Sequence, residues 1–159
     1  IVNSFCRYVS CMVKELVYNK TLLAILVSNS FKKEGVHFFT QDDLSQQLAY
    51  MQHPKGKIII PHVHNSVKRE VHYTQEVLVI KRGRLRVDFY SENQKYLESW
   101  VLGEGDVLLL ATGGHGFEVL DDVEMVEIKQ GPYAGDHDKT RFDGVDTDEL
   151  TLTRVYENG

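Results

Sequence analysis

Cysteine and proline are scarce in this 159-residue chain, and it contains no long apolar or basic run. Its two cysteines, Cys6 and Cys11, cannot build a disulfide framework or a paired zinc motif, so we expect a reducing, cytoplasmic setting. The longest apolar run, residues 22–27, is too short to span a membrane and indicates a buried strand or helix. Nucleic acids and anionic membranes select for clustered Lys and Arg, so a chain of net charge -5 is expected to bind neither.

The length and composition are those of one globular domain spanning residues 1–159. Hydrophobic residues make up 42% of the chain and charged residues 26%. A chain of this length and composition can form a hydrophobic core without disulfides or a structural metal. We expect the core at about residues 46–130 and an exit segment, residues 131–159, packed on its outside. Residues 1–11 are interpreted as an upstream or non-native extension without an assigned function, because the sequence from Met12 onwards looks more like a natural start.

Short runs rich in apolar, β-branched and aromatic residues alternate with turn residues over most of the chain. Strands spaced by about ten residues, without helices between them, predict an all-β fold, an antiparallel sandwich or barrel. Residues 13–27 fit a strand or a helix equally well, and residues 36–39 suggest a further short strand. The main predicted strands are 57–63, 72–80, 84–90, 96–102, 106–111, 116–120 and 123–129.

Histidines and one glutamate stand out within "PHVHNSVKREVHYTQEVLVIKRG", residues 61–83. If residues 58–64 form a strand, His62 and His64 point to the same face. Glu76 shares its predicted face with apolar residues, and a buried carboxylate is costly unless it is paired or coordinates a cation. His115 follows two glycines where a new strand begins. The alternatives are a polar loop for the first two histidines, a solvated face for Glu76 and an ordinary turn for His115.

Taken in order, these residues resemble the two motifs of the cupin superfamily, the small jelly-roll barrels. In the first motif HxH precedes a Glu, which is followed by six residues and a Gly, as Glu76 is by Gly83. The second motif runs from Gly-Asp to a His, as residues 105–115 do. The interval between the histidine pair and Glu76 is longer than is usual, at eleven residues, and indicates a lengthened hairpin at the barrel mouth. A second departure is Ala111, which stands where the second motif commonly has Pro.

The resemblance implies an antiparallel double-stranded β-helix, the jelly-roll cupin barrel, with a short N-terminal strand or helix extension. It also implies one divalent transition metal, Fe, Mn, Ni, Co or Zn, held by His62, His64, Glu76 and His115. Such an ion keeps positions for water or substrate and carries a local charge of about +1, which favours an anionic or chelating ligand. The expected function is an enzyme acting on a small polar or anionic molecule by Lewis-acid or oxygen chemistry.

Two other functions stay open for a chain with these motifs. One is a cupin of the sugar-nucleotide ketoisomerase or epimerase type, in which histidines act as acid and base. The other is a non-catalytic cupin that binds a small ligand. The candidate substrate-binding residues are Tyr73, Gln75 and Arg69, and His72 is an alternative ligand or proton carrier. Exposed sheet edges favour a homodimer.

Overall fold

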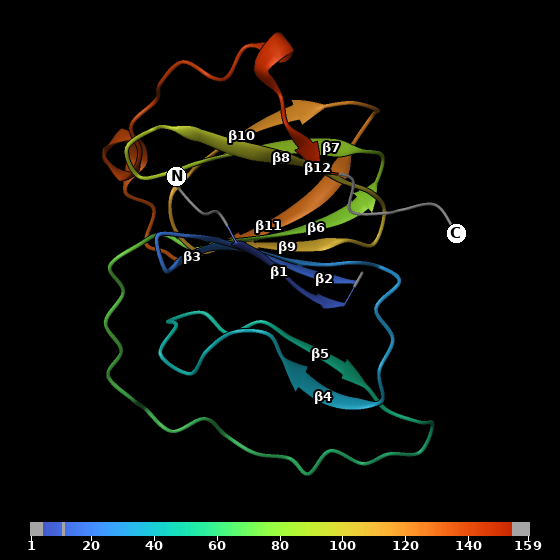
Figure 1. Cartoon of the computed structure of the whole chain (residues 1–159). Helices are drawn as coiled ribbons and strands as arrows, with labels where there is room; N and C mark the ends of the chain where they lie inside the picture. The colour runs from blue at the N-terminus through green and yellow to red at the C-terminus, as the bar shows by residue number, and fades with distance from the viewer. Residues whose placement is uncertain (1–4, 11, 154–159) are drawn as a thin grey trace. The chain divides into compact units, whose positions relative to one another are not determined.

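The computed structural model describes residues 5–10 and 12–153 (Figure 1), and for residues 5–10 it describes the backbone alone. The predicted all-β class is confirmed, and every strand pair except β12 with β8 is antiparallel. The strands are β1 Phe5–Ser10, β2 Val13–Tyr18, β3 Thr21–Val27, β4 Gly35–Phe38, β5 Ala49–Gln52, β6 Glu76–Arg82, β7 Leu85–Tyr90, β8 Tyr96–Leu102, β9 Val107–Leu110, β10 Gly114–Val119, β11 Glu124–Lys129 and β12 Leu152–Thr153, with 3-10 helices η1 Gly135–Asp138 and η2 Thr147–Glu149. Among the described residues, no helix has the length and apolar character needed to cross a bilayer.

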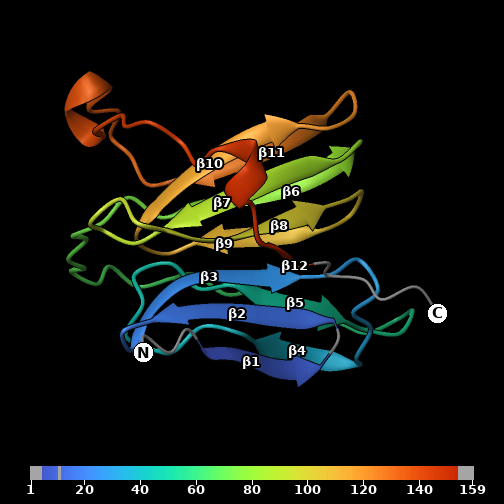
Figure 2. The same ribbon diagram turned by 45° about the horizontal axis from the view of Figure 1, so that its top comes forward.

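The chain divides into two compact units, Lys32–His72 and the rest. The larger unit is a sandwich of a six-stranded sheet, in the order β1-β2-β3-β9-β6-β11, and a four-stranded sheet, in the order β10-β7-β8-β12. Figure 1 shows these two sheets face to face, and Figure 2 shows the strands of the larger sheet side by side. The smaller unit contains the hairpin β4–β5. Over the described residues neither sheet closes into a barrel.

The core of the sandwich comes from alternating residues of the facing sheets. In β7, Leu85, Val87 and Phe89 are buried against the other sheet, and Phe89 packs edge-on to Trp100 with ring centroids 4.5 Å apart. The residues between them point to the opposite face, because side chains alternate along a strand. The core cluster consists of Leu16, Leu23, Ala24, Leu26, Leu78, Ile80, Leu85, Val87, Phe89, Trp100, Leu102, Leu108 and Leu110.

Six of the seven main predicted strands are confirmed, with β6 beginning four residues later than predicted. The short strand predicted at 36–39 is confirmed as β4, and residues 13–27 form the hairpin β2–β3. Its turn uses Asn19 and Lys20, whose φ angles are 49° and 67°. The predicted strand at 57–63 is wrong, because these residues, all of them described, belong to no strand. They lie in no hydrogen-bonded sheet, and Pro61 has no N–H to donate to one.

Residues that follow the last long strand run over the outer face of the four-stranded sheet. Tyr90, which points outward from β7, contacts the ring of Phe142 at a centroid distance of 5.0 Å. Its hydroxyl accepts a hydrogen bond of 3.0 Å from the backbone N–H of Val145. The chain ends its described path with β12, which pairs parallel with β8.

Candidate metal centre

Glu76 and His115 form a carboxylate–imidazole pair between the two sheets. Glu76 opens β6 and faces inward beside Leu78 and Ile80, while His115 lies opposite the core residue Phe89 in the pairing of β10 with β7. Oε2 of Glu76 is 3.2 Å from Nε2 of His115. The Glu76 and His115 side chains are 12% and 29% exposed, so the imidazole is in part accessible to solvent. Of the two interpretations of Glu76, a solvated carboxylate or a buried one with a partner, the structure therefore agrees with the second.

The surroundings of Glu76 favour its charged form. The hydrogen bond from His115 lowers the pKa of the Glu76 carboxyl, and burial acts against this by disfavouring the charge. The ammonium groups of Lys129 and Lys139 lower the pKa further. Lys129 lies opposite Glu76 in the pairing of β11 with β6, with Nζ 3.9 Å from Oε1 of Glu76. The site thus combines a carboxylate, an imidazole and a cation.

Two glycines bring His115 into this position. Gly113 has a φ of 77°, and a Cβ there would lie 2.7 Å from the backbone oxygen of Tyr90. At Gly114 a Cβ would meet the side chains of Tyr90 and Phe142 at 3.2 and 3.0 Å. Only glycine lets the start of β10 approach the end of β7 this closely. Close contacts with Tyr90 and Phe142 therefore explain why two glycines precede His115.

Gly105 and Asp106, the start of the second motif, hold a turn together and contact no part of the Glu76–His115 pair. The Asp106 carboxylate is fully buried and accepts hydrogen bonds from the backbone N–H groups of Gly103, at 2.8 Å, and Asn29, at 2.9 Å. Gly105 has a φ of 82°, which favours glycine. These residues tie the turn before β9 to the chain that follows β3.

His62 and His64 form a second pair, which lies in the smaller unit. Their ring centroids are 5.2 Å apart with an interplanar angle of 80°, and Nδ1 of His62 donates to the Ile60 carbonyl at 3.0 Å. Both residues are exposed. The two pairs belong to different units of the chain. Within the part that the structure describes, no group of three or more His, Cys, Asp or Glu side chains is placed to hold a metal ion.

The other residues singled out from the sequence have diverse environments. Tyr73 is 55% exposed, and Gln75 is buried, with its backbone N–H donating to the side-chain oxygen of Gln130. Arg69 lines an open hollow of the smaller unit together with acidic residues. His72 is exposed, with Nε2 3.9 Å from Glu70. Sequence reasoning missed Lys129, because only the register of β11 against β6 places it beside Glu76.

No protein-family model, curated protein or solved structure matches this chain. Imidazole nitrogen and carboxylate oxygen, the donor atoms of the Glu76–His115 pair, can both bind Fe, Mn, Ni, Co and Zn. Two donors are too few to hold such an ion tightly, so a metal site at this pair would need further ligands.

Proposed function

We propose that the protein is a metal-binding cupin enzyme acting on a small polar or anionic molecule by Lewis-acid or oxygen chemistry. His62, His64, Glu76 and His115 would hold one divalent transition metal. The observation that carries the proposal is the 3.2 Å contact between Glu76 and His115, which come from facing sheets and are the second pair of the expected ligand set. When bound, the metal would supply a Lewis acid.

The path of β6 to β11 supports the jelly-roll part of the proposal. The chain passes repeatedly between the sheets, since β6, β9 and β11 belong to one and β7, β8 and β10 to the other. Such crossing is typical of a double-sheet jelly roll, which has eight strands in all. Among the described strands, β10 and β11 end their sheets, and they follow each other in the chain.

The inward face of β10 carries an apolar half and a polar half. Val119, Phe117 and His115 share this face, because each lies opposite a core residue of β7. Phe117 and Val119 are nevertheless 40% and 56% exposed. On the neighbouring edge strand, Met125 lies opposite Ile80 and is 39% exposed. Among the described residues, these inward side chains of β10 and β11 are therefore only partly buried at this edge.

Residues 58–64 carry the first two residues of the expected ligand set. In an extended strand, His62 and His64 would share one face, so their imidazoles could converge on one ion. This spacing supports a four-ligand site.

Lys129 supports an anionic substrate. Its ammonium lies beside Glu76 on the inward side of β11, where its side chain is 29% exposed, and it is also 3.4 Å from Glu127. A metal bound by one carboxylate keeps a net positive charge. A carboxylate or phosphate of the substrate would then meet the ion and this lysine together.

Metal analysis of protein purified without chelator tests the proposal. We expect stoichiometric metal in the wild type, and loss of most of it in His64→Ala together with a lower melting temperature, because metal bound only to the folded state stabilises it. His72→Ala is the matched control, since it removes a histidine from the same exposed segment and should keep the metal. Wild-type protein that takes up none of Fe, Mn, Ni, Co or Zn would exclude the proposal.

A second function is favoured by the pair itself. A carboxylate that orients an imidazole is also an acid–base unit, as needed by a sugar-nucleotide ketoisomerase or epimerase. In that case His115→Ala would abolish turnover of a sugar nucleotide, while removal of metal by chelator would leave turnover unchanged. Loss of turnover on chelation, with recovery on adding metal back, would favour the metal enzyme.

A further inference from the structure

A segment that begins at the end of η1 is anchored on both sides of the Glu76–His115 pair. We define residues 138–145 as the strap. We infer that the strap carries a binding residue, Lys139, which together with Lys129 holds an oxyanion group of the ligand, a carboxylate or a phosphate. This inference rests on the proposed function, and it adds the residue that would bind the charged group of the substrate and the segment that positions it.

The first anchor joins the strap to the strand that carries Glu76. Oγ1 of Thr74 donates a hydrogen bond of 2.8 Å to the carboxylate of Asp138. Thr74 lies two residues before Glu76, and Lys139 directly follows Asp138. The ammonium of Lys139 is near enough to Glu76 for its charge to lower the pKa of the Glu76 carboxyl. The hydrogen bond therefore fixes the backbone from which Lys139 extends beside the start of β6.

The second anchor joins the strap to the strand that carries His115. The Phe142 ring packs edge-on to the ring of Tyr90, at the end of β7, with centroids 5.0 Å apart. It also lies against Gly114, where a Cβ would be 3.0 Å from the ring. The backbone N–H of Val145 donates to the Tyr90 hydroxyl at 3.0 Å. Because β6 and β10 belong to facing sheets, the strap runs from one sheet to the other beside the pair, with its lysine between the two anchors.

The charges around Lys139 leave its ammonium available to a ligand once the Glu76 carboxylate is engaged elsewhere. Lys129 is shared between two carboxylates, with Nζ 3.4 Å from Glu127 and 3.9 Å from Glu76. Lys139 forms no close ion pair with any described residue and acts on Glu76 through its charge. In the metal-free chain the Glu76 carboxylate balances that charge. A divalent ion bound to Glu76 takes this balance away, and an oxyanion that meets both lysines would restore it.

Glu76→Gln tests the binding of an anion without any metal. The variant removes the carboxylate and keeps both ammonium groups, so chelator-treated Glu76→Gln should bind an anion about fivefold more tightly than chelator-treated wild type. Isothermal titration with inorganic phosphate and, separately, with malonate measures this gain and shows which oxyanion group is preferred. Adding Lys139→Met should remove most of the gain. Lys81→Met in the same background is the matched control, because Lys81 is an exposed lysine at the other end of β6. Equal affinities in the two lysine variants, or no binding of either anion by Glu76→Gln, would overturn the inference.

Thr74→Val tests the strap while keeping every charge. It removes the hydroxyl that holds Asp138, so backbone amides of residues 138–142 should exchange faster with solvent. The anion affinity of the Glu76→Gln background should fall as well, because Lys139 is no longer held beside the site. Thr147→Val, at an exposed threonine of η2, is the control and should change neither quantity. The same anion affinity in both threonine variants would show that the strap does not position the lysine.

Metal content separates this inference from the metal proposal. Wild-type protein that binds no metal, while Glu76→Gln shows anion binding that depends on Lys139, would exclude the metal centre and keep the binding residue. Metal-loaded wild type whose affinity for phosphate and malonate is unchanged by Lys139→Met would overturn the inference and leave the metal centre standing.

Discussion

The ammonium of Lys14 lies 4.2 Å from the ring centroid of Trp100 and 2.8 Å from Oε1 of Glu98, inside the sandwich. Lys14 comes from β2 and the other two residues from β8, so the contact joins the two sheets. The indole N–H of Trp100 donates to the same Glu98 oxygen. The Lys14 and Glu98 side chains are 6% and 13% exposed, so each charge depends on the other for its stability in the interior.

Removing one charge of this pair is expected to destabilise the fold strongly. Glu98→Gln leaves the Lys14 charge buried without a counter-charge, which should lower the free energy of unfolding by about 3 kcal/mol. Adding Lys14→Met should recover part of this loss, because the double variant buries no charge. Urea unfolding measures both. The control is Asp121→Asn, which breaks the solvent-exposed Arg84–Asp121 pair and should change the stability far less, because water screens exposed ion pairs. Equal losses in Glu98→Gln and Asp121→Asn would contradict the prediction.

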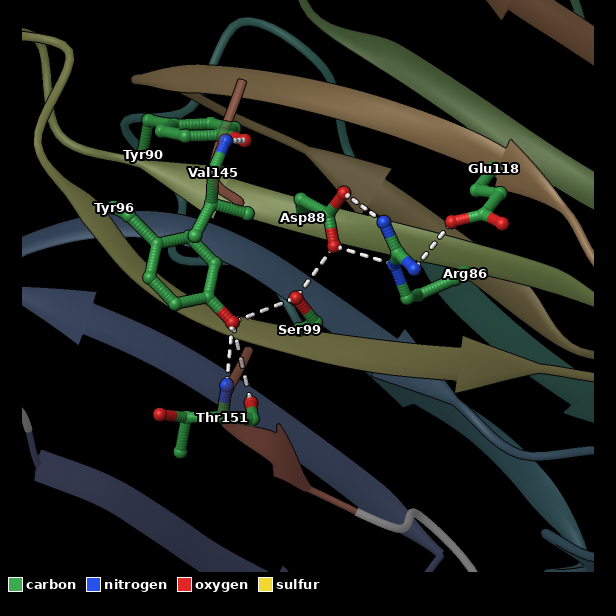
Figure 3. A network of polar contacts seen from close by, with 8 residues as sticks. All are labelled: Arg86, Asp88, Tyr90, Tyr96, Ser99, Glu118, Val145 and Thr151. Atoms are coloured by element: carbon green, nitrogen blue, oxygen red, sulfur yellow. Dashed lines mark hydrogen bonds and ion pairs between the residues drawn. The ribbon is translucent and has the colours of Figure 1, made fainter. Parts of the chain in front are cut away.

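A polar network holds the chain at Thr151 against the outer face of the four-stranded sheet (Figure 3). The Arg86 guanidinium binds the buried Asp88 carboxylate through two contacts of 2.8 and 3.0 Å, and Ser99 donates to the same carboxylate. The Tyr96 hydroxyl is 2.8 Å from Oγ of Ser99 and accepts from the backbone N–H of Thr151 at 2.9 Å. Tyr96 therefore links the network to the final strand.

Loss of the Tyr96 hydroxyl should loosen that strand. Tyr96→Phe removes the acceptor for the Thr151 N–H, and we expect the free energy of unfolding to fall by about 1–2 kcal/mol. Backbone amides near Thr151 should also exchange faster in the variant. Tyr133→Phe provides the control, because Tyr133 is 86% exposed and its hydroxyl should not matter. Unchanged exchange near Thr151 would show that β12 is held without the tyrosine.

Much of the fold could be predicted from the sequence because apolar and polar residues alternate along strands of the sandwich. Leu85, Val87 and Phe89 mark one buried face. Glu76 shares its strand face with the apolar residues Leu78 and Ile80, which correctly suggested that it faces inward. The strand predicted at residues 57–63 is wrong for a physical reason. Apolar β-branched residues favour a strand only where another strand pairs with them, and none of the described strands pairs with residues 57–63.

The neighbours of the site depend on register, which sequence patterns do not specify. Lys129 lies beside Glu76 because β11 pairs with β6 in one particular alignment, including a shift near Glu124. The pairing of Lys14 with Glu98 likewise joins residues 84 positions apart. Such contacts follow from sheet order and could be found only once the strands were assembled.

Glu76 should make the stability of the metal-free protein depend on pH. Its pKa in the folded state is lowered from the ordinary value of 4.5, chiefly by the hydrogen bond from His115. A lowered carboxyl pKa stabilises the folded state above the ordinary value, and this contribution is lost as the pH falls below it. The difference in unfolding free energy between wild type and Glu76→Gln should therefore shrink from about pH 7 to about pH 3. Chelator-treated protein must be used.

The cause of the shift can be tested separately by NMR titration of the Glu76 carboxyl. His115→Asn removes the first cause of the lowered pKa, so the pKa of Glu76 should move up towards its ordinary value. His72→Asn changes a histidine that is not among these causes and should leave the titration unchanged. A Glu76 pKa that is the same in wild type and His115→Asn would rule out the hydrogen bond as the cause.

Gly83 should tolerate no side chain, which gives a steric reason for the glycine that closes the first motif. Its φ is 80°, and a Cβ there would lie 2.1 Å from the backbone oxygen of Asp122. Gly135 has a φ of 68°, and no atom lies within 4 Å of its Cβ position. An alanine at residue 135 would therefore add backbone strain without a steric clash. We expect Gly135→Ala to lower the free energy of unfolding by about 1 kcal/mol. Gly83→Ala should lose on the order of 3 kcal/mol, because the turn between β6 and β7 must also move away from Asp122.

Urea unfolding of the two alanine variants separates these effects. Similar losses would mean that the turn adapts to the added methyl group, and the glycine would then matter only through its φ angle. A much larger loss in Gly83→Ala would show that the approach of the β6–β7 turn to Asp122 restricts the position. The interval of six residues between Glu76 and Gly83 then has a structural meaning, because it is the length of β6 from its inward carboxylate to the turn that the chain at Asp122 packs against.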